Sequence, residues 1–210
     1  MYKRQVDPNS TNPYQLTEAD RTVIGNTTPK FSGGFGLNAT YKGFDMSMFF
    51  NFMYDFDVLN ANKIMLTTWA DNKENNFLMD IASDKRWRNF DDMGNEIRYS
   101  PEVLAEFNKN ATMWNPTSIG RPICMSYAVE DGSFLRLNSA TLGYTLPSVW
   151  TKKVGLSKVR FYVSGNNLFT LTGYSGYDPE VNIATGLTPN IDYNRYPRSR
   201  TYTFGAQLTF

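Results

Sequence analysis

The chain has 210 residues, of which 41% are hydrophobic and 15% aromatic, and its formal net charge is +1. That near-neutral charge argues against nucleic-acid binding, which selects basic surfaces. The sequence has no histidine and one cysteine, which removes Ser-His-Asp and Cys-His catalytic systems, most zinc sites and any internal disulfide. No apolar run approaches the roughly 18 residues of a spanning helix, and the mean hydropathy of −0.45 suits a membrane protein only if strands cross the bilayer.

The first predicted elements are a loop and a β-hairpin. Residues 1–30 are rich in Asn, Thr, Pro and Asp and predict a loop. Alternation from Lys30 to Tyr41 and over 44–54 then predicts two strands, with a tight turn at Lys42 and Gly43. Both strands alternate, and the second has an almost continuous apolar face: Phe44, Met46, Met48, Phe50, Phe52 and Tyr54. Each strand matches the roughly 9–11 residues of a tilted membrane-spanning strand.

A long polar stretch follows from about residue 55 to residue 130. Ser100 and Pro101 predict the start of a short helix, with serine as N-cap and proline at the first helical position, and residues 58–70 predict another. A connection of this length exceeds the usual range, so we expect it to have a function or a small fold of its own.

Three more strands are predicted in the last part of the chain. They cover residues 134 to about 145, stopped by Pro147, then 159–166 and 202–210, with a loop rich in Gly, Pro, Asn and Tyr over 172–199. The first of these strands leaves its register open. If Leu135 and Leu137 lie on the apolar face, residues 140–144 return to that face only through a bulge.

The connections between these strands alternate between short and long, at 42–43, 55–130, 147–157 and 172–198. This pattern is typical of outer-membrane barrels, whose short turns are periplasmic and whose long loops are extracellular. It predicts extracellular loops at 1–30 and 55–130, and an aromatic girdle near the periplasmic rim formed by Tyr41, Phe44, Tyr144 and Phe210.

The last nine residues alternate as well and end on an apolar aromatic residue. Thr203, Gly205, Leu208 and Phe210 are similar to the C-terminal signal of barrel proteins, which implies recognition by the barrel-assembly machinery. The N-terminus has no apolar stretch typical of an export signal. We therefore expect the chain to be a piece of a longer polypeptide, with a gene remnant as the alternative.

Several stretches together resemble the C-terminal end of SusC/RagA-like TonB-dependent outer-membrane transporters. They are Asp20-Arg-Thr-Val-Ile-Gly-Asn26, Tyr41-Lys-Gly-Phe-Asp45, Val129-Glu-Asp-Gly-Ser-Phe-Leu-Arg-Leu137, Thr141-Leu-Gly-Tyr-Thr-Leu-Pro147, Ser164-Gly-Asn-Asn-Leu-Phe-Thr170, Tyr174-Ser-Gly-Tyr-Asp-Pro-Glu180 and Tyr196-Pro-Arg-Ser-Arg-Thr-Tyr202. The resemblance covers residues 20–54 and 127–210 and leaves 55–126 without a match, so it does not identify the ligand.

The resemblance implies an all-β fold, an antiparallel meander of about five strands from a barrel of about 22 strands, with short helices in its extracellular loops. Residues 31–210 would form the C-terminal strands, after the loop segment 1–30. It further implies the C-terminal part of a nutrient importer in the cell outer membrane. Such an importer takes up glycans or peptides with a SusD-like surface lipoprotein and is driven by TonB through an N-terminal region that this sequence lacks.

Candidate contact residues for a ligand or a partner protein lie in the two long loops. They are Trp69, Trp87, Trp114, Tyr174, Tyr177 and Asp178. Aromatic rings stack on sugar faces, but packing and hydrogen bonding inside the loops are competing explanations. Asp7, Asn9, Thr11 and Asp20 supply fewer oxygen ligands than calcium needs, so no metal is expected.

The sequence predicts no enzyme, no catalytic residues and no cofactor, because its neighbouring carboxylates point apart in extended chain and nothing supplies a pocket around them. The alternative function is a soluble β-sandwich that binds carbohydrate. A sandwich would bury residues such as Phe44, Phe50, Phe204 and Leu208 under a second sheet.

Overall fold

The computed structural model describes residues 22–68, 76–81, 85–116, 124–180 and 190–210. They fall into two compact units. One contains Leu59–Val129, and the other contains Gly25–Val58 and Glu130–Phe210.

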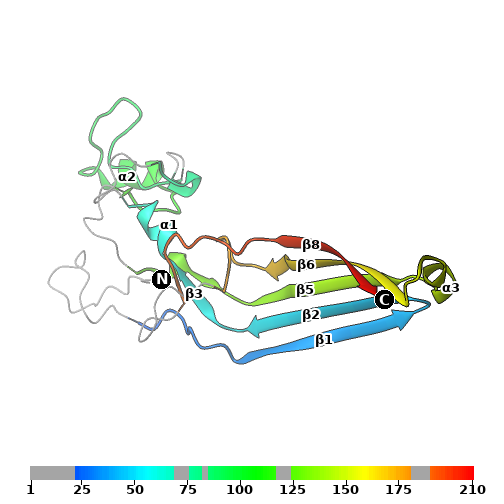
Figure 1. The fold of residues 1–210 in the computed structure, drawn as a ribbon. Helices are drawn as coiled ribbons and strands as arrows, with labels where there is room; N and C mark the ends of the chain where they lie inside the picture. Colours follow the sequence, from blue (N-terminus) through cyan, green and yellow to red (C-terminus); the bar gives the residue numbers. More distant parts are fainter. Residues whose placement is uncertain (1–21, 69–75, 82–84, 117–123, 181–189) are drawn as a thin grey trace. The chain divides into compact units, whose positions relative to one another are not determined.

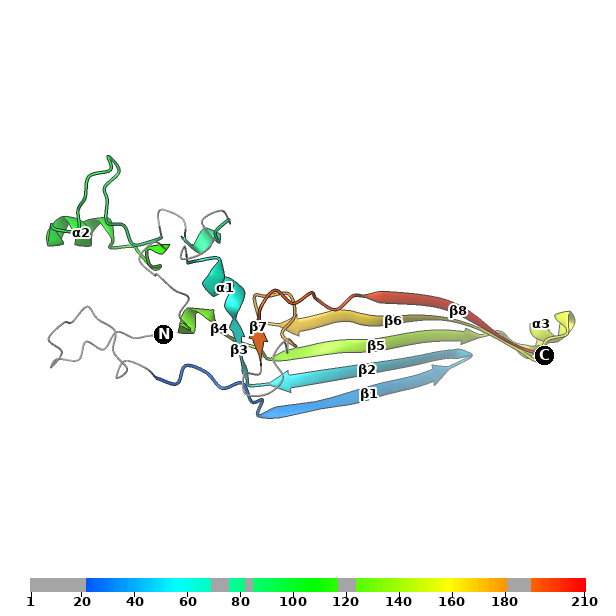
Figure 2. The same ribbon diagram turned by 60° about the vertical axis from the view of Figure 1, so that its left-hand side comes forward.

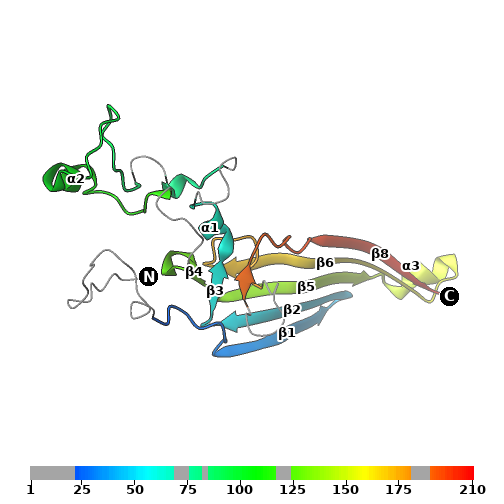
Figure 3. The same cartoon turned by 90° about the vertical axis from the view of Figure 1, so that its left-hand side faces the viewer.

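The second unit is built on one five-stranded antiparallel sheet (Figure 1). Its strands, in spatial order, are β1 (Phe31–Tyr41), β2 (Phe44–Tyr54), β5 (Phe134–Thr145), β6 (Lys158–Thr172) and β8 (Thr201–Thr209). The order in the sheet is also the order along the chain, so the sheet is a meander, which confirms the predicted fold class. The five strands stay side by side in one layer when the view is turned by 60° and by 90° (Figures 2 and 3).

The two ends of the sheet differ in their connections. At one end, here called the turn end, lie the β1–β2 turn, the β5–β6 connection and the C-terminus (Figure 1). Lys42 and Gly43 both have positive φ values, 44° and 91°, as a two-residue hairpin turn of type I′ requires. A Cβ on Gly43 would lie 2.8 Å from the Thr145 carbonyl oxygen, so the turn has no room for a side chain there.

Aromatic rings gather across the strands at the turn end. Tyr41 pairs with Phe44, Phe44 with Tyr144, and Tyr144 with Phe161. The rings of Phe44 and Tyr144 are 4.5 Å apart. The first three aromatic residues of the predicted girdle therefore lie in one row across the sheet.

A bulge at Asn138 sets the register of β5. Leu137 pairs with Phe50 and Ser139 with Phe49, so Asn138 has no partner on β2. Residues paired across antiparallel strands share a face. Leu137 before the bulge and Ala140 after it therefore lie on the same face, which is the bulged arrangement that the sequence left open.

The prediction for β6 was too short. The sequence indicated a strand ending at Asn166, whereas β6 continues to Thr172. Asn167 has a φ of 52°, and the pairing with β5 shifts by one residue here. Asparagine tolerates this backbone conformation, so the strand continues through Asn166 and Asn167 with a local irregularity.

The pairing separates the sheet into an apolar face and a polar face. The apolar face carries aromatic and aliphatic residues on every strand: Phe31, Phe35, Leu37, Tyr41, Phe44, Met46, Met48, Phe50, Phe52, Tyr54, Leu135, Leu137, Ala140, Leu142, Tyr144, Phe161, Val163, Phe169, Leu171, Tyr202, Phe204, Ala206 and Leu208. The polar face carries mainly hydroxyl, amide and charged groups, including Ser32, Asn38, Thr40, Asp45, Ser47, Asn51, Arg136, Thr141, Tyr162, Ser164, Thr170, Thr203 and Gln207.

The apolar face is open in the part of the chain that the structure describes. Phe44 is 50% exposed, Phe204 80% and Leu208 51%. These side chains would be buried in a β-sandwich, so the structure gives the soluble sandwich no second layer.

The opposite end of the sheet, here called the loop end, is closed by a small core. Phe56, Val58, Phe134 and Tyr174 are buried there, with Met53 packed against them. A second sheet has three strands in the order β4 (Val129–Asp131), β3 (Asp57–Asn60), β7 (Ile191–Asp192). Val58 of the core belongs to β3.

The helices are short. α3 (Ser148–Thr151) and a 3-10 turn (Lys152–Val154) form the β5–β6 connection, and Gly155 ends it with a φ of 74°. The first unit holds α1 (Ala61–Met65), α2 (Pro101–Phe107) and 3-10 turns over Met79–Ile81 and Ser126–Ala128. Among the described residues, every helix is too short or too polar to cross a bilayer.

The structure differs from the predicted helices in the cap of one helix and the length of the other. α2 begins at Pro101 as predicted, but the Ser100 side chain makes no capping hydrogen bond. The helix predicted over 58–70 is shorter, because residues 57–60 form β3. Asn60 caps α1 instead, accepting a hydrogen bond from the Lys63 N–H at 3.3 Å.

Candidate functional site

The polar face carries an ion pair that bridges two strands across a third. Arg160 on β6 donates from Nε to Asp45 Oδ1 on β2 at 2.8 Å, and its Nη2 donates to Asp45 Oδ2. Gly143 of β5 lies between them, and a Cβ there would come within 2.5 Å of both side chains. The bidentate pair therefore depends on the absence of a side chain at residue 143.

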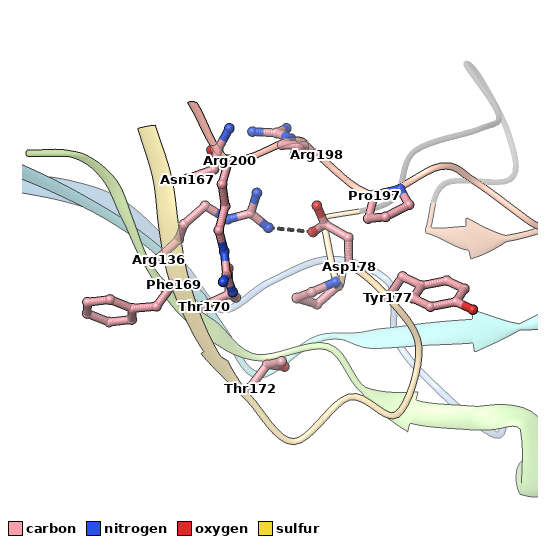
Figure 4. Close-up of a pocket in the computed structure, with 11 residues that line it drawn as sticks. Arg136, Asn167, Phe169, Thr170, Thr172, Tyr177, Asp178, Pro197, Arg198 and Arg200 are labelled. Atoms are coloured by element: carbon pink, nitrogen blue, oxygen red, sulfur yellow. Dashed lines mark hydrogen bonds and ion pairs between the residues drawn. The ribbon is translucent and has the colours of Figure 1, made fainter. Parts of the chain in front are cut away.

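A second charged group lies at the loop end of the polar face and centres on Arg136 (Figure 4). Arg136 is 2% exposed, and its Nη2 donates to Asp178 Oδ1. Its Nη1 lies 3.8 Å from Glu180 Oε2, and Arg198 Nη2 lies 2.9 Å from Glu180 Oε1. Asp178 Oδ1 also accepts a hydrogen bond from the Glu180 N–H at 2.9 Å, which holds the loop backbone in place.

We call these four residues, Arg136, Asp178, Glu180 and Arg198, the arginine clasp. They come from three separate parts of the chain: the start of β5, the loop after β6 and the segment before β8. The clasp joins that loop and that segment to the sheet. The Arg136 guanidinium also lies 5.4 Å from the centre of the Phe134 ring, which belongs to the core of the loop end.

A cavity of about 250 Å³ lies beside the clasp. Its lining is rich in arginine and in hydroxyl and amide groups: Arg136, Asn167, Phe169, Thr170, Thr172, Tyr177, Asp178, Pro179, Pro197, Arg198 and Arg200 (Figure 4). The Nε of Arg136 is buried and has no hydrogen-bond partner in the described part of the chain. The lining thus holds three arginines and one carboxylate, that of Asp178.

No family model matches the chain. TonB-dependent receptor P3 of Formosa agariphila is 35% identical over 202 residues, which cover 93% of this chain and 18% of that protein. TonB-dependent receptor SusC of Bacteroides thetaiotaomicron is 38% identical over 88 residues, 40% of this chain and 8% of SusC. Among solved structures, the RagAB peptide importer matches 93% of this chain and 19% of its own, with TM-scores of 0.68 in the open-open state and 0.69 in the closed-closed state, at 26% and 25% identity.

The chain belongs to the SusC/RagA-like TonB-dependent receptors. Its sheet is a section of their barrel wall, and the resemblance inferred from the sequence is confirmed. The chain spans less than a fifth of the length of the curated relatives it matches, 18% in the case of receptor P3.

The predicted contact residues of this receptor chain are dispersed. Tyr177 is 83% exposed and lines the cavity, whereas Asp178 is buried in the clasp. Trp87 is 40% exposed. Trp114 donates from Nε1 to the Thr67 carbonyl oxygen at 3.1 Å and stacks edge-on against another ring of its unit, so it packs inside the loop. Trp69 lies outside the described residues, as do the oxygen donors Asp7, Asn9, Thr11 and Asp20.

Tyr174 is part of the buried core of the loop end. It is 6% exposed, and its hydroxyl donates to Asp192 Oδ2 at 2.7 Å. Burial, followed by the hydrogen bond to Asp192, raises the pKa of Tyr174 far above its ordinary value, so the phenol stays protonated and remains a donor. A Cβ on Gly176 would meet the Tyr174 ring, so the loop is closely packed against it.

The residues of the predicted assembly signal lie on or next to β8. Thr203 pairs with Ser164 on the polar face, and Gly205 pairs with Tyr162. A Cβ on Gly205 would overlap the Tyr162 ring, so this glycine makes room for the ring. Leu208 is 51% exposed on the apolar face, and Phe210 is 89% exposed just beyond the strand.

Sequence analysis missed Arg198 and Arg200 as site residues. The available signal was an arginine inside an apolar strand, Arg136, together with two arginines in the stretch Tyr196-Pro-Arg-Ser-Arg-Thr-Tyr202. In the part of the chain that the structure covers, no three His, Cys, Asp or Glu side chains come together as a metal site.

Proposed function

We propose that this chain forms part of the wall of an outer-membrane nutrient importer. In this proposal β1, β2, β5, β6 and β8 cross the bilayer, with the apolar face toward lipid and the polar face toward the lumen. The observation that carries the proposal is the continuity of the two faces through the bulge at Asn138. An apolar face this large on a single layer of strands requires a cover, and acyl chains provide one.

The same arrangement gives the chain an orientation. The turn end would be periplasmic, and the loop end would be extracellular, with residues 1–30 and the long connection at 55–130 outside the cell. The terminal stretch with Thr203, Gly205, Leu208 and Phe210 would be read by the barrel-assembly machinery.

We take the proposed partners and ligand classes from the family. The complete importer would draw energy from TonB and work with a SusD-like surface lipoprotein, and it would carry oligosaccharides or peptides. Support for a peptide comes from the RagAB peptide importer, and support for the family context comes from SusC. Neither fixes the ligand of this chain.

Cysteine labelling in the intact receptor tests the proposal. Cys124 is exposed and is replaced by serine first. Met48→Cys and Ser47→Cys then place a thiol on the apolar and on the polar face of the same strand. In whole cells, a charged maleimide should label residue 47 and not residue 48, and a lipid-soluble reagent should show the reverse preference. Recovery of the intact receptor in the soluble periplasm would refute the proposal.

A further inference from the structure

We propose that the cavity beside the arginine clasp is a subsite for a carboxylate group of the imported molecule. This inference rests on the proposed function, because it takes the polar face as the wall of the import path. Arg136, Thr170 and Thr172 line the cavity from the polar face of β5 and β6, and Arg198 and Arg200 line it from the segment before β8. A molecule moving along that face would pass the cavity at its loop end.

The charged residues at the cavity and the clasp are three arginines and two carboxylates, so one arginine has no carboxylate partner within this group. Asp178 and Glu180 are engaged by Arg136 and Arg198 within the clasp. Arg200 lines the cavity, is exposed and makes no ion pair among the described residues. Its guanidinium is therefore available to an incoming anion, and arginine binds a carboxylate through two parallel N–H donors.

The buried donor of the clasp points to the same chemistry. Arg136 is 2% exposed and lines the cavity, and its Nε has no hydrogen-bond partner among the residues that the structure describes. Glu180 Oε2 in the same clasp is likewise buried without a hydrogen-bond partner among the described residues, so neither atom is open to the cavity. The Arg136 guanidinium therefore favours an anion in the cavity through its charge, which acts over a distance at this poorly hydrated position. The side chains of Asn167, Thr170 and Thr172 add further polar groups to the wall.

The size of the cavity limits what it can hold. Its volume of about 250 Å³ lies just below the roughly 300–1,000 Å³ of ordinary ligand pockets. One acidic side chain, one C-terminal carboxylate or one acidic sugar ring would fit, and a whole oligomer would not. The exposed ring of Tyr177 on the cavity wall offers an apolar surface to the rest of the molecule.

The two sources of a carboxylate are separated by two pairs of probes. The intact receptor, purified in detergent, is titrated with fluorescent tetra-aspartate peptide against tetra-asparagine, and with fluorescent trigalacturonate against its methyl ester. We expect one acidic probe to bind about 10- to 100-fold more tightly than its neutral partner, because hydrogen bonds to charged groups contribute that much. The preference should shrink as salt is raised, because an exposed guanidinium is screened.

The variant Arg200→Gln should remove most of that preference, whereas Arg195→Gln should retain it. Arg195 lies in the same segment and does not line the cavity. A preference for the peptide or for the sugar acid identifies the source and supports the inference in either case.

Equal binding of acidic and neutral probes by the unmodified receptor would overturn the inference, and so would equal behaviour of the two variants. Neither result would touch the proposed function, which is tested separately by the position of the same receptor in the outer membrane. Heat-modifiable migration on gels shows whether each variant has folded. The comparison of probes on the unmodified receptor needs no variant and stays decisive if Arg200→Gln fails to fold.

Discussion

Removing the guanidinium of Arg136 should release the loop that follows β6. The Arg136→Ala variant leaves Asp178 with a buried carboxylate and no cation beside it, and it leaves Glu180 paired with Arg198 alone. The alanine also loses the contact between the guanidinium and the Phe134 ring at 5.4 Å. Because Arg136 is 2% exposed, water cannot take over these contacts unless the loop opens.

The expected magnitude follows from that burial. Breaking a buried ion pair by removing one partner costs about 3–5 kcal/mol. If the cost falls on local opening of the loop, amide hydrogen exchange in residues 173–180 and 190–198 should accelerate roughly 10²- to 10³-fold or more. The assay is hydrogen exchange followed by mass spectrometry on the intact receptor in lipid nanodiscs, with the strand segments as internal references.

Two further variants show whether the pair itself is responsible. Arg136→Met combined with Asp178→Leu replaces the pair by apolar side chains and should restore much of the protection, since such replacements are often close to neutral. Lys109→Ala removes an exposed ion pair with Glu106, whose side chains are 60% and 70% exposed, and should change local stability by less than about 1 kcal/mol. Exchange in Arg136→Ala no faster than in Lys109→Ala would refute the clasp as the element that holds the loop.

Three other predictions concern the sheet and the loop end. Met48→Lys should destabilise the barrel by about 2–4 kcal/mol, because in the proposed orientation its charge would face lipid, while Ser47→Lys on the polar face should be tolerated. Guanidinium unfolding in vesicles measures both, and equal effects would contradict the proposed assignment of faces. Gly143→Ala should reduce the heat-modifiable folded fraction because its Cβ would lie 2.5 Å from the strand-bridging ion pair, whereas Gly173→Ala, with nothing within 4 Å, should not. The raised pKa of Tyr174 means that only the unfolded state loses its phenol proton just above the ordinary value of 10.0, so resistance of the loop to proteinase K should fall as pH rises above 10.0. Tyr174→Phe should lack that alkaline loss, and an unchanged pH profile in this variant would refute the linkage.

The strands could be predicted from the sequence because the alternation of apolar and polar residues determines most of them. The alternation predicted along 30–41 and 44–54 matches β1 to within one residue and β2 at both ends. A strand with lipid on one side and a polar environment on the other must alternate at every position. Where the alternation is broken, the pattern no longer gives the register or the end of a strand. The bulge was foreseen only as a condition on the register of residues 135–144, and the continuation of β6 through Asn167 was missed.

The arginine clasp could not be predicted from the sequence for a related reason. The pattern places Arg136 on the polar face but says nothing about its partner, which lies 42 residues further along the chain. Long-range pairing depends on where a loop returns in space, and an irregular loop has no periodicity that reveals its path. For Tyr174 the sequence left ligand contact and hydrogen bonding inside the loop as alternatives. The structure buries this residue in the core of the loop end, with its hydroxyl donating to Asp192.

The arginine clasp also explains why three distant stretches of the family resemblance belong together. The resemblance includes Val129–Leu137, Tyr174–Glu180 and Tyr196–Tyr202, and each of them contributes at least one member of the clasp. A buried arginine shared by two loop carboxylates holds the loop after β6 and the segment before β8 against the polar face of the sheet. Arg200 follows Arg198 by two residues in that segment, so the clasp also positions beside the cavity a guanidinium that makes no ion pair among the described residues.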